Sequence, residues 1–190
     1  MPSDIYGYIA GMWIALAVLW FGAAFSAKKK TRAEPSSSRF AHIAVMSLAF
    51  ALLFKPQTGI GPLSWRFLPE TAAAGYAGLG LTMAGVLLAA FARLCLGGNW
   101  SAVVSIKEGH QLVRRGPYSL VRHPIYSGLL LAFAGTAIAF GEWRCLAGLV
   151  LSTAGLWTKS RLEERWLIDR FGQEYVTYRR DVRALIPYIL

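Results

Sequence analysis

The residues best suited to chemistry lie in one short polar segment between two apolar stretches. Residues 116–128 read GPYSLVRHPIYSG and gather an Arg, a His and two Tyr. Some thirty-five residues later two carboxylates, Glu163 and Glu164, stand side by side. Ionisable groups near a bilayer are costly unless they pair or bind something. The pattern therefore predicts a polar binding site at a membrane surface, with Arg122, His123 and the Glu pair as its charged groups.

Further motifs follow in an order typical of one enzyme family. The Glu pair is followed by FGQEYVTY at residues 171–178 and by an Ile-Pro pair at 186–187. This ordered set resembles the isoprenylcysteine carboxyl methyltransferase and phospholipid methyltransferase superfamily of integral membrane enzymes, and the resemblance covers roughly Arg93 to Leu190. It implies a methyltransferase that uses S-adenosylmethionine. The implied acceptor is lipophilic or membrane-embedded, with a carboxylate, thiol or amine as its nucleophile.

The resemblance also implies roles for individual residues. The candidates for cofactor binding are Tyr118, His123, Pro124, Tyr126, Gly128, Glu163 and Glu164. The catalytic candidates are Arg122, Glu164 and Arg165, and the candidate substrate contacts are Asn99 and Trp100. No metal is expected, since two cysteines do not make a structural zinc site.

Physical reasoning supports such a set of residues. Methyl transfer from a sulfonium is an in-line displacement that depends mainly on positioning and on excluding water. Neighbouring residues on a helix point about 100° apart. One Glu is therefore expected to face the cofactor, and the other to pair with a base such as Arg161 or Lys159. At Gly128, a side chain is expected to block the close approach of a ligand.

Each candidate also has a plainer interpretation. Arg122 fits a snorkelling side chain or a partner for a lipid phosphate. His123 fits a helix cap, and the Glu pair fits a solvated helix face. The two tyrosines fit interfacial aromatics. It is the combination of these residues in order that favours the binding site.

Composition places the whole chain in a bilayer. Hydrophobic residues make up 55% and charged residues 16% of the 190 residues, whereas soluble domains have about 25% charged residues. Five apolar runs occur, at residues 5–27, 40–54, 71–92, 126–140 and 145–158. These runs predict an all-α integral membrane protein with about five transmembrane helices. The last two runs are separated by only four residues, Gly141–Arg144, and predict a tight helical hairpin.

The remaining segments complete the expected fold. Cytoplasmic C-terminal helices are expected at 159–171, ended by Gly172, and at 173–183. The glycines of run three predict close helix packing, notably Gly75, Gly78, Gly80 and Gly85. Val103, Val104 and Ile106 predict a short extended piece. The chain is expected to be one membrane domain over residues 1–190, with N-terminal transmembrane helices in 1–92 and a methyltransferase-like, cofactor-binding region in 93–190.

The net charge of +10 is distributed unevenly and predicts the topology. By our count, 17 of the 20 Lys and Arg residues follow runs one, three and five. Because positive residues mark the cytoplasmic side, the N-terminus is expected outside and the C-terminus in the cytoplasm, in the inner membrane if the host is bacterial. Attraction to anionic lipid explains this charge, so the bilayer is an expected partner and nucleic acid is not.

Two other functions stay open at this point. A membrane reductase of the sterol reductase type would bind NADPH instead, and is expected to have more spans and more basic residues for the 2′-phosphate. A non-catalytic lipid-binding membrane protein would bind neither cofactor.

Overall fold

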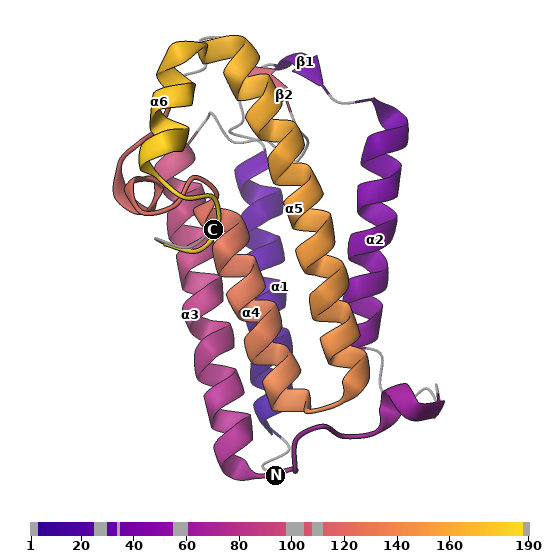
Figure 1. Ribbon diagram of the computed structural model, residues 1–190. Coiled ribbons are helices and arrows are strands. Elements are labelled where there is room, and N and C mark those ends of the chain that lie inside the picture. Colours follow the sequence, from indigo (N-terminus) through magenta and orange to yellow (C-terminus); the bar gives the residue numbers. More distant parts are fainter. Residues whose placement is uncertain are drawn as a thin grey trace.

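Long antiparallel helices make up most of the molecule. The computed structural model describes residues 4–24, 30–33, 35–54, 61–97, 105–107 and 112–187. The helices in these ranges are α1 (Asp4–Ala24), α2 (Ser36–Phe54), α3 (Ala72–Leu96), α4 (Pro124–Phe140), α5 (Trp143–Phe171) and α6 (Gln173–Asp181). The helices α1 to α5 run alternately up and down, and α6 folds back beside the end of α5 (Figure 1). The predicted all-α bundle is confirmed.

Short elements connect the helices. They are the 3-10 turns η1 (Gly61–Ser64) and η3 (Gly116–Ser119) and the strands β1 (Lys30–Ala33) and β2 (Ser105–Lys107). The strand β2 contains Ile106 of the predicted extended piece, whereas Val103 and Val104 lie outside the described residues.

Within the described ranges, three helices are long and apolar enough to cross a membrane, namely α1, α2 and α3. The apolar helix α4 is shorter, at 17 residues. It forms the predicted hairpin with α5 through Gly141, whose left-handed φ of 67° ends α4. Glycine reaches this conformation without steric cost.

One boundary differs from the prediction. The apolar run 145–158 and the amphipathic segment 159–171 form a single helix, α5, of 29 residues. No Gly or Pro interrupts residues 156–171, which are rich in good helix formers, so nothing ends the helix before Gly172. At 1.5 Å per residue α5 is about 43 Å long. Its polar C-terminal part therefore extends beyond an apolar layer of about 30 Å.

A seam of small residues joins α3 to α4. A Cβ atom added to Gly85 would lie 2.4 Å from the backbone nitrogen of Ala132, and one added to Gly135 would lie 2.4 Å from that of Thr82. Gly78 meets α4 in the same way, whereas Gly80 faces open space. The predicted packing role is thus confirmed for Gly78 and Gly85 and wrong for Gly80. Such contacts let membrane helices approach closely.

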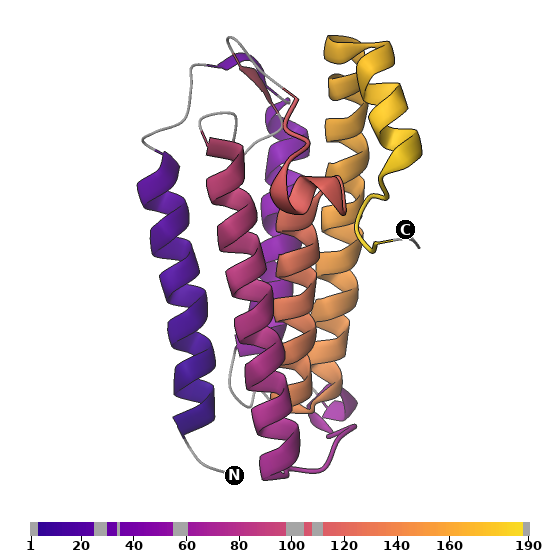
Figure 2. The ribbon, with the colours of Figure 1, turned by 90° about the vertical axis from the view of Figure 1, so that its left-hand side faces the viewer.

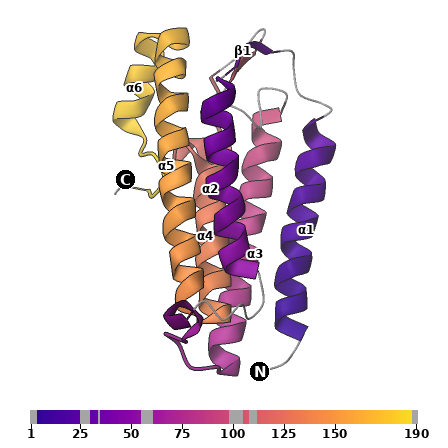
Figure 3. The same cartoon turned by 90° about the vertical axis from the view of Figure 1, so that its right-hand side faces the viewer.

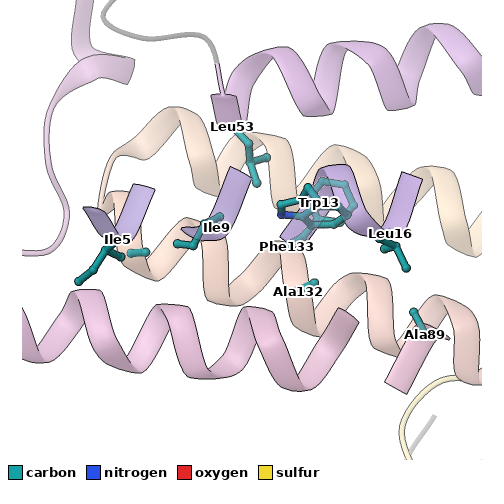
Figure 4. Close-up of a cluster of buried hydrophobic side chains, with 9 residues drawn as sticks. Ile5, Ile9, Trp13, Leu16, Leu53, Ala89, Ala132 and Phe133 are labelled. Atoms are coloured by element: carbon teal, nitrogen blue, oxygen red, sulfur yellow. The ribbon is translucent and has the colours of Figure 1, made fainter. Parts of the chain in front are cut away.

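The helices α1 and α2 complete the bundle. α1 stands at the edge of the bundle beside α3 (Figure 2), and α2 packs along α5 (Figure 3). Apolar side chains of α1, notably Ile9 and Trp13, point into a core shared with Leu53 and Phe133 (Figure 4). The Trp13 Nε1 donates to Thr136 Oγ1 at 3.1 Å, so this polar atom is satisfied inside the core.

We expect Gly85→Ala to destabilise the protein and Gly80→Ala to leave it unchanged or slightly more stable. The first adds a methyl group against backbone, at a cost of about 1–3 kcal/mol. The second adds only helix propensity. The predicted loss corresponds to a fall in Tm of roughly 3–10 °C, measured in detergent. Equal effects of the two substitutions would contradict the seam.

Candidate functional site

A buried ion pair lies where the polar segment meets α5. Arg122 precedes the first turn of α4, and Glu164 lies in the polar part of α5. The Arg122 Nε and Nη2 donate to Glu164 Oε1 at 2.9 and 2.6 Å. The two side chains are only 7% and 4% exposed. A buried charge pair of this kind is favourable only when its remaining hydrogen-bonding groups are also satisfied.

Arg122 satisfies its remaining donors on the C-terminal end of α6. Its Nη1 donates to the carbonyl of Arg179 at 3.0 Å and to the carbonyl of Val182. The last carbonyls of a helix lack partners within the helix, and a cation is favourable there. The guanidinium is thus engaged by protein groups. The structure gives Arg122 a positioning role, and the catalytic role expected from the sequence stays a prediction.

The C-terminal tail is fastened to the same segment. The backbone nitrogens of Arg122 and His123 donate to the carbonyls of Arg183 and Ala184, at 2.7 and 3.0 Å. The hydroxyl of Ser127 donates to the carbonyl of Leu185 at 2.5 Å. The tail therefore covers the start of α4.

His123 lies between the two carboxylates. Its Nε2 is 3.2 Å from Glu164 Oε1, and its Nδ1 is 3.6 Å from Glu163 Oε2. The ring of Tyr126 stacks on it, with 5.4 Å between centroids and an interplanar angle of 8°. The Tyr126 hydroxyl donates to Glu163 Oε1 at 2.5 Å. His123, Tyr126 and Glu163 therefore form one connected polar group beside the ion pair.

The two glutamates have different surroundings, as the sequence predicted. Besides Arg122, Glu164 has Arg179 Nε and Arg161 Nη1 at 3.5 and 3.6 Å from its Oε2. The expected pairing of one glutamate with Arg161 is thus confirmed. The Glu163 side chain is 24% exposed. It is the carboxylate of the pair that an incoming ligand reaches more easily.

The charge state of Glu164 follows from these contacts. Burial alone raises the pKa of Glu164, but the hydrogen bonds from His123 and Arg122 outweigh burial and lower its pKa to about 2. A carboxylate with this pKa is ionised at neutral pH. Glu164 therefore accepts hydrogen bonds and does not act as a general acid.

Two buried polar atoms of the site lack a hydrogen-bond partner in the described part of the chain. They are Glu164 Oε2 and the hydroxyl oxygen of Tyr175. Burial raises the pKa of Tyr175, and the nearby negative charge of Glu164 raises it further, so the hydroxyl keeps its proton. Buried polar groups are normally satisfied, and exceptions often mark a place for a ligand or a water molecule.

Tyr118 and Tyr178 fasten α6 to the segment before α4. The Tyr178 hydroxyl donates to the carbonyl of Tyr118 at 2.5 Å. Both side chains are buried, and burial raises the pKa of Tyr178 to about 12. Tyr175 and Tyr178 share one face of α6 through their spacing of three residues, which explains the FGQEYVTY pattern.

The remaining candidates take other places in the fold or lie outside the described residues. Gly128 faces α3: an added Cβ would lie 2.6 Å from the nitrogen of Ala89, so helix packing, and not ligand approach, explains its missing side chain. Arg165 is exposed on α5 and lies outside the cluster. Pro124 is the first residue of α4, where proline fits well. Asn99 and Trp100 lie outside the described residues.

Sequence reasoning missed Arg179 and the tail carbonyls. Arg179 lies 15 positions beyond Glu164, on a separate helix, and only the turn at Gly172 brings the two together. A backbone carbonyl carries no signal in the sequence. The spacing of Tyr175 and Tyr178 was the one available sign that α6 packs on the site.

Fold and site together define an α-helical integral membrane protein with a polar site at one end of its bundle. Residues 73–174 match the phospholipid methyltransferase family, to which the chain belongs. The match begins at residue 73, earlier than the expected Arg93, and so includes α3, whose seam positions α4.

Individual relatives are consistent with this family. The chain is 32% identical to the protein-S-isoprenylcysteine O-methyltransferase of Xenopus laevis, over 59% of this chain and 40% of the relative. It is 42% identical to methanethiol S-methyltransferase 1 of Bradyrhizobium diazoefficiens, over 37% of this chain and 24% of the relative. The chain therefore spans less than half the length of these two relatives.

A solved structure has a similar fold over part of its length. The eukaryotic intramembrane Ras methyltransferase ICMT aligns with a TM-score of 0.56 and 26% identity. The alignment covers 84% of this chain and 55% of that chain.

We expect Arg122→Ala to lower the free energy of unfolding by about 3–5 kcal/mol, because it leaves Glu164 charged and buried without its main partner. It also frees the carbonyls at the end of α6, so the tail should become sensitive to protease. Arg165→Ala is the matched control and should change stability by less than about 0.5 kcal/mol. Thermal unfolding in detergent and limited proteolysis measure both effects. Equal stability of the two variants would rule out the anchoring role.

Acid should weaken the fold through Glu164. Its folded pKa of about 2 lies below the ordinary 4.5, so the stabilisation is complete above pH 4.5 and is lost as pH falls toward 2. The loss attributable to Glu164 is about 3 kcal/mol. Between pH 6 and pH 2.5, the difference in the free energy of unfolding between the wild type and Glu164→Gln should therefore become smaller. A gap that stays constant with pH would contradict this prediction.

Proposed function

We propose that this protein is an S-adenosylmethionine-dependent methyltransferase that acts on a lipophilic acceptor. The observation that carries the proposal is the pair of buried atoms without hydrogen-bond partners, Glu164 Oε2 and the Tyr175 hydroxyl, beside two arginines at the end of an apolar bundle. Membership of the phospholipid methyltransferase family supports the reaction class. The names of the relatives include both O- and S-methyltransferases.

The residues present fit this cofactor. S-adenosylmethionine carries an ammonium group and ribose hydroxyls, which suit Glu164 Oε2 and the outward carboxylate of Glu163. Its own carboxylate suits the guanidinium groups of Arg161 and Arg179, which are 47% and 40% exposed. When bound, the cofactor supplies an electrophilic methyl group.

The protein's own groups have two tasks in this reaction. The helix α6 and the tail cover the site and exclude water, held there by Arg122 and Tyr178. The second task is positioning: a thiol or amine acceptor has to lose its proton before it binds, since Glu163 is already engaged by the cofactor. A carboxylate acceptor carries no such proton and depends on positioning alone.

We propose that the site faces the cytoplasm and that the N-terminus lies outside. At the opposite end of the bundle, the described cations are paired: Arg144 lies 2.6 Å from Glu142, and Arg66 lies 3.7 Å from Glu70. The excess of positive charge therefore lies at the end of the bundle that carries the site, and the positive-inside rule assigns that end to the cytoplasm. The contacts described for the site lie within residues 93–190, which supports assigning cofactor binding to that region.

Calorimetry with S-adenosylhomocysteine tests the proposal. We expect saturable binding to the purified protein and none of NADPH, the cofactor of a reductase. Glu163→Gln should weaken binding at least about tenfold, since it removes a charged hydrogen-bond acceptor. Arg165→Gln should bind as the wild type does. Binding of NADPH alone, or of neither ligand in lipid nanodiscs, would reject the proposal.

A second assay identifies the acceptor class. Methyl transfer to a prenylated cysteine and to a long-chain thiol would be compared as a function of pH. A thiol acceptor should give a rate that rises with pH as the proton is lost, and a carboxylate acceptor a rate that stays flat above pH 6. If neither compound is methylated, the proposal of a lipophilic acceptor is rejected for these two classes.

A further inference from the structure

The side chain of Lys159 lies on the bilayer side of the candidate site. Lys159 is half-buried and directly follows the apolar run of α5, residues 145–158. Its Nζ lies 6.0 Å from the centroid of the Tyr126 ring, which belongs to the neighbouring helix α4. Glu163 comes four residues later on α5, so its Cα lies about 6 Å farther from the apolar run than the Cα of Lys159. An acceptor that arrives from the bilayer along α5 therefore meets Lys159 before it meets Glu163.

The direction of the Lys159 side chain differs from that of a lipid-facing lysine. A lysine at the end of a membrane helix often extends along the lipid toward the headgroups. Lys159 instead approaches the face of an aromatic ring on α4, where a cation is attracted. The hydroxyl of the same tyrosine, Tyr126, donates to Glu163. Lys159 is thus directed toward α4, which packs beside α5 (Figure 1), and toward the polar group of the site.

The arginines of the site have other contacts. Arg122 is buried against Glu164 and donates to the carbonyl of Arg179. The guanidinium groups of Arg161 and Arg179 lie 3.6 and 3.5 Å from Glu164 Oε2, where they suit the carboxylate of S-adenosylmethionine. Lys159 precedes Arg161 and Glu164 along α5. It is therefore the cation on this helix that suits a negative charge arriving with the acceptor.

We propose that Lys159 binds the negative charge of the acceptor, and that the protein therefore methylates an anionic nucleophile, a carboxylate or a thiolate, and not an amine. This role rests on the proposed function and narrows its substrate class. An ammonium group has three N–H donors, so it can bind an anion in addition to a ring face. It repels a protonated amine, and it offers the N–H groups of an unprotonated amine no acceptor.

Methyl transfer removes the charge that Lys159 recognises. The oxygen or sulfur of the acceptor forms a bond to the methyl carbon, while the bond from that carbon to the sulfonium sulfur breaks and leaves its electron pair on sulfur. The negative charge of the acceptor and the positive charge of the sulfonium disappear together, and no proton moves. The contact with Lys159 is therefore strongest before the reaction and weakest with the neutral product. Such a residue lowers KM and favours product release without raising kcat.

The substitution Lys159→Gln tests this role by binding. Calorimetry would compare a prenylated cysteine, which carries a carboxylate, with its uncharged carboxamide, using protein in lipid nanodiscs saturated with S-adenosylhomocysteine. The variant should bind the carboxylate at least about tenfold more weakly, and the carboxamide within about twofold of the wild type. Lys159→Arg should restore most of the binding of the carboxylate. The matched control Arg170→Gln removes an exposed charge of α5 and should change neither affinity.

Kinetics add a measurement that a merely structural role would not change. In Lys159→Gln, the KM for the prenylated cysteine should rise by at least about tenfold, while kcat stays within about twofold. The same change in KM for a long-chain thiol would extend the role to thiolates, and an unchanged value would restrict it to carboxylates. A fall in kcat at constant KM would overturn the role of Lys159.

Failure of this role and failure of the proposed function give different results. If S-adenosylhomocysteine does not bind to the wild type, the proposed function is rejected, and the role of Lys159 with it. If it binds, equal losses for the carboxylate and the carboxamide in Lys159→Gln would overturn the role of Lys159 alone. Methylation of a long-chain amine faster than that of the prenylated cysteine and the thiol would overturn the exclusion of amines.

Discussion

The ion pair between Arg122 and Glu164 is the interaction on which the rest of the site depends. Both charges are almost fully removed from solvent, which is tolerable only because each is bonded several times. Glu164 Oε1 receives both Arg122 and His123, and Arg122 reaches the end of α6 as well. One pair thus fixes the start of α4, the polar part of α5, and α6 relative to one another.

Because Glu164 is committed to this pair, its neighbour has a different task. The helical turn between adjacent residues directs Glu164 inward and leaves Glu163 partly exposed beside Tyr126 and His123. A doublet of like charges is therefore divided into one carboxylate buried in the ion pair and one that is partly exposed. The second oxygen of Glu164, Oε2, has no hydrogen-bond partner among the described residues. It lies near the half-exposed side chains of Arg161 and Arg179, on the side of Glu164 away from Arg122 Nε.

Structural features that depend on the local sequence were predicted well. The apolar runs predicted the bundle, the short link before Trp143 predicted the hairpin, and Gly172 was correctly expected to end α5. The errors and omissions concern tertiary contacts. Gly128 packs against α3, about forty residues earlier in the chain, so its neighbours cannot be read from the local sequence. The hydrogen bonds of Arg122 likewise depend on distant backbone carbonyls at the end of α6. The helix boundary expected at residue 159 was wrong. The change there from apolar to polar residues moves the helix from an apolar into a polar environment, but it does not end the helix.

The polar motif of residues 122–128 contains residues that hold the helices together, and it does so for a physical reason. Between helices in a bilayer there is little hydrophobic driving force, so close packing and polar contacts must hold them. Gly128 supplies the first by meeting the backbone of Ala89, and Arg122 supplies the second through Glu164. His123 and Tyr126 carry neither of these tasks, and with Glu163 they form the polar group beside the ion pair. The positions of the polar side chains at the membrane edge therefore depend on how closely the helices beneath them pack.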